Sequence, residues 1–366
     1  MKTKSILATI LCATLLLAGC SKEENMDKGP AGTQRTMTFT LRTPAGDKVI
    51  YTKATHDESE YKINRLTLYE YEVADDGTTT TLSRILKYPD GLGDNTLDLV
   101  DGGNGTYTFS IIIPQSNDGK KFAYKFIAND APADPAVGSS FDGFKTTEAT
   151  VALTEGNTAD ALAADGTGIA MSGVAKNGTD ETITMQNGIT CTVQMTRIVS
   201  RVDIKYETPN LKVTKVELQN APKKGYLFPQ DALTAPATED DKLTLGLNAN
   251  VTLPTGYLKD DPDQTVVEMK KAFYLYERSN EDGNTAQVHI EYEVAANGTT
   301  YTGAVDVPFK KTSDDLGYVN AQRNHLYTIV LGHADDPVAG KVTAKLVVDE
   351  WNSVEIDEPM TEDIIP

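Results

Sequence analysis

The chain has 366 residues, of which 53 are Asp or Glu and 34 are Lys or Arg, and its formal net charge is −19. This length is sufficient for two domains of ordinary size. The excess of negative charge argues against a nucleic acid or an anionic membrane surface as a binding partner, since both would repel it. The same charge favours a self-repelling protein surface.

The first residues predict an export signal. Lys2 and Lys4 precede the apolar run Ile6–Leu17, which is too short to span a bilayer comfortably, and small residues follow it. We therefore expect residues 1–19 to be a signal peptide. The segment Leu17-Ala18-Gly19-Cys20 resembles a bacterial lipobox, which implies that Cys20 becomes the acylated first residue and carries acyl chains such as palmitate. The alternative is an ordinary secretion signal with a chance Cys.

Residues 20–35 are polar, contain Gly29, Pro30 and Gly32, and predict a flexible tether. The Lys22-Glu23-Glu24 run inside it resembles the surface-export tag of lipoproteins from the Bacteroides group. Beyond the tether, apolar and polar residues alternate with a period of two, which is typical of β-strands. The expected strands are Thr36–Arg42, Lys62–Glu72, Thr106–Ile113, Phe122–Ala128, Gly188–Lys205, Val213–Gln219, Ala272–Tyr276, Ala286–Val294, Thr300–Val307, His325–Leu331 and Val342–Val348.

These strands predict an all-β fold built from β-sandwiches. Four dipeptides favour hairpin turns: Asn104-Gly105, Asn177-Gly178, Asn187-Gly188 and Asn297-Gly298. A weak internal repeat, in which each half opens with a long strand and then an alternating strand rich in Lys or Arg, predicts two tandem sandwiches. We place the N-terminal domain at residues 36–187 and the C-terminal domain at residues 188–366.

The residue inventory does not support an enzyme. The four His residues show no metal-ligand spacing, and the acidic clusters at 260–263 and 281–284 lack the spacing of a calcium loop. We therefore expect no catalytic residues, no metal and no cofactor. If the signal is removed and Cys20 acylated, Cys191 remains the single thiol, and its alternating surroundings predict a small core residue.

Several segments, in this order over nearly the whole chain, resemble the fimbrillins, the type V pilins of Bacteroides and Porphyromonas relatives. Besides the lipobox they are Tyr51–Thr55 with Lys62–Tyr69, Ala170–Gly173, Thr196–Ile204, Gln219–Pro222 with Gly225–Pro229, Phe273–Glu277, Gln322–Thr328 and Val348–Asn352. The resemblance implies two transthyretin-like β-sandwich domains and a structural subunit of a fimbrium (pilus) that acts in cell adhesion.

The resemblance also implies an assembly mechanism in which the first strand is removed by proteolysis. Met37, Phe39 and Leu41 point to one side of that strand, and they would occupy a groove in the domain until the strand is removed. A trypsin-like, Arg- or Lys-specific surface protease would cut between Lys53 and Ala54, where the family usually has Arg. Arg42 and Arg35 are alternative cleavage sites.

The incoming strand is expected to come from the C-terminal stretch of another subunit by donor-strand exchange. Its apolar residues are Val342, Ala344, Leu346, Val348, Trp351, Val354 and Ile356. The sequence leaves open which part of residues 342–366 is donated and which part stays in its own domain.

The expected partners are further copies of this chain, other fimbrial subunits, the processing protease and the outer membrane, through the lipid anchor; nucleic acid is not expected. The expected location is the outer membrane surface and then the fimbrium. Two alternatives stay open: a lipid-anchored tip or anchor subunit, and a surface glycan-binding lipoprotein. The latter would need exposed aromatic side chains, and the chain has a single Trp but 16 Tyr residues.

Overall fold

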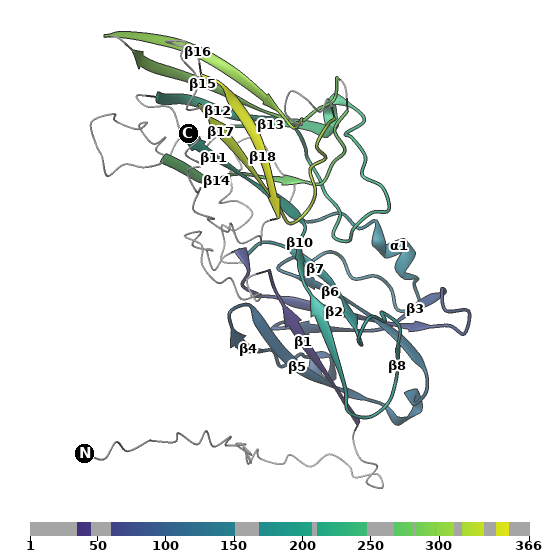
Figure 1. Ribbon diagram of the computed structural model, residues 1–366. Coiled ribbons are helices and arrows are strands. Elements are labelled where there is room, and N and C mark those ends of the chain that lie inside the picture. Colours follow the sequence, from purple (N-terminus) through teal and green to yellow (C-terminus); the bar gives the residue numbers. More distant parts are fainter. Residues whose placement is uncertain are drawn as a thin grey trace, which may run out of the picture. The chain divides into compact units, whose positions relative to one another are not determined.

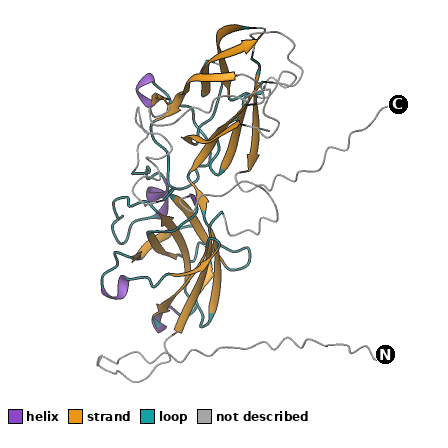
Figure 2. Cartoon of the chain, turned by 90° about the vertical axis from the view of Figure 1, so that its left-hand side faces the viewer, coloured by secondary structure: helices purple, strands orange, loops and turns teal. Residues whose placement is uncertain are grey.

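The structure is a computed structural model of the chain. It describes residues 35–44, 60–150, 168–206, 211–246, 267–281, 283–296, 298–310, 317–332 and 342–350. The predicted signal peptide, Cys20, Lys53, Ala54, Trp351, Val354 and Ile356 lie outside these residues. In the described part of the chain, strands dominate and the helical segments are single turns (Figures 1 and 2). The expectation of an all-β fold is confirmed.

The first half of the chain forms one ten-stranded sheet. Its central path runs β3-β2-β6-β7-β9-β1-β5-β4, and β8 and β10 pair with β6 and β7 beside it. The strands are β1 (Arg35–Arg42), β2 (Leu66–Val73), β3 (Thr80–Tyr88), β4 (Val100–Gly103), β5 (Thr106–Ile113), β6 (Lys121–Ala128), β7 (Met171–Lys176), β8 (Ile183–Thr184), β9 (Ile189–Gln194) and β10 (Thr196–Arg197). The helical turns here are η2 (Gly93–Asn95), η3 (Gln115–Asn117) and α1 (Phe141–Lys145).

The ten-stranded sheet folds over on itself and encloses an apolar core. Strand β7 pairs with both β6 and β9, and so connects the two layers. Across the core, the Phe39 ring of β1 lies 5.1 Å from the Tyr124 ring and 5.5 Å from the Phe126 ring of β6. Alternating burial along β1 and β9 produces this core, because every second side chain of a strand faces the same side.

The second half forms two four-stranded sheets, β14-β11-β17-β18 and β13-β12-β15-β16 (Figure 1). The strands are β11 (Val199–Tyr206), β12 (Leu211–Pro222), β13 (Lys242–Gly246), β14 (Val267–Tyr276), β15 (Gln287–Ala296), β16 (Thr299–Pro308), β17 (His325–Leu331) and β18 (Ala344–Glu350), with the turn η4 (Glu239–Asp241) before β13. A second apolar cluster fills the space between them and includes Phe273, Ile290 and Tyr327.

The weak internal repeat corresponds to a repeated topology. Strand β1 lies between an antiparallel neighbour, β5, and a parallel one, β9; likewise β11 lies between antiparallel β14 and parallel β17. The next strand in each half, β2 or β12, pairs with the strand that follows it and with one later strand. The two halves therefore share a strand order that their sequences barely reveal.

The strand expected over Gly188–Lys205 is wrong as a single element. It is divided into β9, β10 and β11: β9 pairs with β1 and β7, β10 pairs with β7, and β11 pairs with β14 and β17. The alternating pattern continues through all three, because a change of partner strand does not interrupt the period of two. The change from the first sheet to the second thus falls between β10 and β11, after Arg197. The division of residues 36–366 into two domains stays a prediction.

Two other differences concern strand ends and missed strands. β1 begins at Arg35, which the sequence places in the predicted tether. Strands β3, β7 and β13 are not among the expected strands, because their alternation is weaker. By contrast, β5 and β17 have the predicted bounds, and Asn104 and Gly105 both have positive φ, as a type I′ hairpin turn requires.

Candidate functional site

Strand β1 is buried in the middle of a sheet. Met37, Phe39 and Leu41 are each 0% exposed, as the sequence predicts. Phe39 pairs in register with Phe109 of β5 and with Cys191 of β9. Its ring stacks on that of Phe109 at a centroid distance of 5.1 Å. These three side chains fill sockets in the core, and each contributes about 1.5–3 kcal/mol by burial.

Backbone hydrogen bonds hold β1 on both edges. Its antiparallel register with β5 extends over all eight residues from Arg35 to Arg42, and its parallel register with β9 extends over six. Beyond the strand, the Thr43 amide donates to the Gly105 carbonyl at 2.8 Å, and the Met195 amide donates to the Arg42 carbonyl at 2.8 Å. If β1 were absent, both neighbouring strands would therefore have an unpaired edge.

Cys191 belongs to this core. The side chain is buried opposite Phe39, and burial raises the pKa of its thiol to about 11. A thiol with so high a pKa is a poor nucleophile at neutral pH. The prediction of a core residue is confirmed.

The two alternative cleavage sites lie within the β1 ladder. Arg35 is the first residue of β1 and forms an ion pair with Asp118. Arg42 is its last residue and pairs with both Thr106 and Gln194. Since a protease needs an accessible extended segment, cleavage at either residue requires local fraying. Lys53 and Ala54 lie outside the described residues.

A buried polar cluster follows the predicted cleavage segment. Glu60 is 0% exposed; its carboxylate accepts hydrogen bonds from the Arg201 Nη1 at 3.2 Å and the Tyr274 hydroxyl at 2.8 Å. Its backbone carbonyl accepts a hydrogen bond from the Arg197 Nε at 2.8 Å. Arg201 also pairs with Asp203 at 2.6 Å. The chain entering β2 is thus fastened to β10, β11 and β14.

The protonation states of this cluster follow from its burial and its charges. Burial lowers the pKa of the Arg197 guanidinium to about 10. Burial also lowers the pKa of Arg201, but the hydrogen bond and charge of Asp203, with the charge of Glu60, outweigh this and raise it. Burial and the Glu60 carboxylate raise the pKa of Tyr274. The Arg201 guanidinium is thus paired with the Glu60 and Asp203 carboxylates, whereas the Arg197 guanidinium donates to the Glu60 carbonyl and to the Asn324 side-chain oxygen.

The C-terminal strand β18 lies at the edge of its sheet. Among the described strands it pairs with β17 only, antiparallel, from His325↔Glu350 to Leu331↔Ala344. Val347 and Val348 are 36% and 39% exposed, and Val342, just before the strand, is 5% exposed. Of the predicted donor residues, Val342 is in the core of its own domain and Ala344 and Leu346 pack against that core, whereas Val348 is exposed. An exposed edge carrying apolar side chains is a surface on which another strand can pair.

No group of three or more His, Cys, Asp or Glu side chains in the described ranges is placed to hold a metal ion. No helix within the described ranges is long and apolar enough to cross a membrane.

No family model and no curated protein matches this chain. Among solved structures, it is similar to the tip fimbrial protein Mfa3 from Porphyromonas gingivalis with C-terminal truncation, with a TM-score of 0.50 and 14% identity over 87% of this chain and 100% of that chain. The chain has the fold of a fimbrial protein. A candidate cell adhesion protein from Parabacteroides distasonis has a TM-score of 0.49 and 13% identity over 86% of this chain and 97% of its own. The fimbrial anchor protein Mfa2 from Porphyromonas gingivalis has a TM-score of 0.38 and 10% identity over 86% of this chain and 98% of its own.

Within this fimbrial fold, sequence reasoning found β1 and its inward residues but missed Glu60. In the sequence, Glu60 ends the acidic run 57–60, a composition that is typical of solvated residues. The available signal was Arg201 and Asp203, two opposite charges on the same face of an otherwise alternating strand. Buried charges need partners, and this pair pointed to a polar cluster inside the fold.

Proposed function

We propose that this chain is a structural fimbrial subunit, exported as a surface lipoprotein acylated on Cys20, that polymerises by strand exchange and serves adhesion. The observation that carries this proposal is the position of β1. The first described strand lies buried between β5 and β9, so its removal opens a groove in the middle of a sheet. The shared fold with a fimbrial protein supports the same function.

An incoming strand would replace β1 in this groove. It would pair with the freed edges of β5 and β9 and place apolar side chains in the sockets of Met37, Phe39 and Leu41. Burying three such side chains contributes about 1.5–3 kcal/mol each, and each backbone hydrogen bond contributes about 0.5–1.5 kcal/mol. Together, these contributions support a contact between subunits that dissociates very slowly.

Cleavage between Lys53 and Ala54 by an Arg- or Lys-specific surface protease would separate β1 and the lipid anchor from the rest of the subunit. The pairing of Arg35 and Arg42 within β1 supports Lys53 over these alternatives. The new N-terminus would start only six residues before Glu60, whose contacts with Arg197, Arg201 and Tyr274 do not involve β1. We therefore expect the cleaved subunit to stay folded around its empty groove.

The donor segment would come from residues 342–366 of a neighbouring copy. Because Ala344–Glu350 already pairs with β17, we assign the donated part to the residues after Glu350, including Trp351, Val354 and Ile356. The partners are then further copies of this chain and other fimbrial subunits. The location is the outer membrane before cleavage and the fimbrium after it.

The N-terminal residue of the protein from sheared surface fibres tests this function. Mass spectrometry is expected to find a start at Ala54 or within a few residues of it. An intact, acylated Cys20 in the same sample would instead identify an anchored subunit or a surface binding protein, and it would refute removal of β1.

A further inference from the structure

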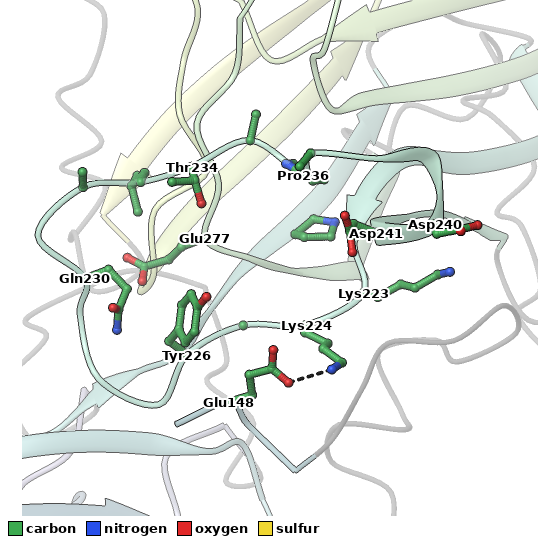
Figure 3. Close-up of a pocket in the computed structure, with 16 residues that line it drawn as sticks. Glu148, Lys223, Lys224, Tyr226, Gln230, Thr234, Pro236, Asp240, Asp241 and Glu277 are labelled. Atoms are coloured by element: carbon green, nitrogen blue, oxygen red, sulfur yellow. Dashed lines mark hydrogen bonds and ion pairs between the residues drawn. The ribbon is translucent and has the colours of Figure 1, made fainter. Parts of the chain in front are cut away.

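A pocket of about 360 Å³ lies beside the end of β12, and none of the residues that line it belongs to β1 or β18. Its wall on one side is the segment Pro222–Tyr226, and the loop from Gln230 to Ala237 arches over it (Figure 3). The turn η4 closes one end. The volume is at the small end of the range for ligand sites, so it fits a small molecule or one or two sugar rings.

The wall of the pocket is held rigidly from behind. Arg323, 8% exposed, donates from Nη2 to the Tyr226 carbonyl at 3.1 Å and from Nη1 to the Leu227 carbonyl at 3.0 Å. Its Nε donates to the Glu277 carboxylate at 2.7 Å. Gly225 lies so close to Tyr276 that a Cβ there would be 2.2 Å from the ring. This position can hold only glycine, and the backbone of Tyr226 is fixed.

On this rigid wall, the Tyr226 side chain stays exposed. It is 40% exposed, and its ring stands in the pocket close to Gln230 and Glu277 (Figure 3). An aromatic ring in a pocket wall gives a flat apolar face with a polar hydroxyl at its edge. The C–H face of a sugar ring packs well on such a surface, while the sugar hydroxyls remain free to bond around it.

The polar groups around the ring are held in fixed orientations. The Gln230 amide nitrogen donates to the carbonyls of Lys145 and Phe228, both at 2.9 Å, which fixes the orientation of its Oε1 acceptor. Glu148 and Lys224 pair at 2.7 Å at the mouth of the pocket (Figure 3). Hydrogen-bond donors and acceptors that are already held in place around an apolar face match a ligand with several hydroxyl groups.

The charge of the pocket decides which polyhydroxyl ligand fits. Four carboxylates line it, from Glu148, Glu277, Asp240 and Asp241, against the ammonium groups of Lys223 and Lys224. Hydrogen bonds from Thr238 lower the pKa of Asp241, which stays ionised at neutral pH. When the Arg323 guanidinium behind the wall is included, the net charge of these groups is slightly negative. Such a site disfavours phosphate and acidic sugars, and its mixed signs do not select a strongly basic peptide.

We propose that this pocket binds a neutral saccharide unit, with the ring stacked on Tyr226 and hydroxyl groups bonded to Gln230, Glu277 and the Glu148–Lys224 pair. The site would give a fimbrial subunit or an anchored surface protein a glycan ligand. The proposal does not depend on cleavage, strand exchange or the assembly mechanism.

The test uses the full chain without its signal peptide. Ligand-observed NMR and titration are run with the methyl glycosides of galactose, glucose, mannose and N-acetylglucosamine, with N-acetylneuraminic acid as an acidic comparison and a lysine-rich peptide as a basic one. At least one neutral glycoside is expected to bind. Tyr226→Ala is expected to weaken it about tenfold, and Tyr226→Phe to retain it, since the ring face remains.

The matched control is Tyr301→Ala, which removes a tyrosine of β16 that is 38% exposed and does not line the pocket. It should leave saccharide binding unchanged, and all three variants should keep the unfolding midpoint of the parent chain. The proposal is overturned if no neutral glycoside binds, if Tyr226→Ala binds as well as the parent, or if only the acidic sugar or the peptide binds.

Discussion

The Glu60 carboxylate lies 3.2 Å from the Arg201 guanidinium, and both side chains are buried. They come from opposite sides of the change between the first sheet and the second. Removing one member of a buried ion pair leaves the other charge without its partner, which costs about 3–5 kcal/mol. Because Arg201 keeps Asp203 at 2.6 Å, we expect a cost near the lower bound.

The variant Glu60→Gln should therefore lower the free energy of unfolding by about 3 kcal/mol, measured by chemical denaturation. The matched control is Glu293→Gln, which removes an exposed partner of Lys212 and should cost about 1 kcal/mol or less. Equal effects of the two variants would show that the Glu60 cluster does not fasten the chain before β2.

Phe39→Ala should destabilise the uncleaved protein by about 3–5 kcal/mol, because it empties a socket between two sheet layers. Thr40→Ala, on the outward side of β1, is the control and should have little effect. If β1 leaves during assembly, fibres of Phe39→Ala should dissociate at the same temperature as parent fibres. Weakened fibres would mean that β1 remains in them.

Deletion of residues 351–366 should abolish assembly and leave a folded monomer, since β18 ends at Glu350 and is kept. The measurement is the ladder of oligomers on a denaturing gel after treatment with a trypsin-like protease. The unfolding midpoint of the uncleaved protein should not change. A full ladder of oligomers from the shortened chain would show that the C-terminal segment is not the donor.

Cys20→Ala should abolish lipid attachment, and the protein should then accumulate in the periplasm without forming fibres. Fractionation of cells and electron microscopy of their surface provide the measurement. Fibres on cells that carry only this variant would contradict export through the lipid anchor.

His289 of β15 should titrate above its ordinary pKa of 6.5, because the Asp306 carboxylate lies 2.6 Å from its ring nitrogen and raises the pKa. A raised pKa in the folded state means that the pair stabilises the fold below pH 6.5 and that this contribution is lost as the pH rises through the folded-state pKa. In Asp306→Asn, an NMR titration should find the pKa nearer to 6.5. An unchanged value would assign the shift to another group.

Much of the candidate assembly site could be predicted from the sequence. The alternation of Met37, Phe39 and Leu41 with threonines predicted a strand with one buried side, and these residues are indeed buried. It did not predict that both edges of β1 are paired, because a period of two identifies a face and not a neighbour. The run from Gly188 to Lys205 shows the same limit, since one unbroken pattern supplies three strands that pair with different neighbours.

The sequence by itself determined the all-β class, the hairpin at Asn104-Gly105, and the inward residues of the first strand. These depend on local rules: side-chain alternation and the backbone freedom of turn residues. Only the tertiary structure placed β1 between β5 and β9, buried Glu60 against Arg201, and arranged Tyr226, Gln230 and Glu277 around one pocket. Such contacts join residues far apart in the chain, so they follow from how sheets pair and pack and not from any local pattern.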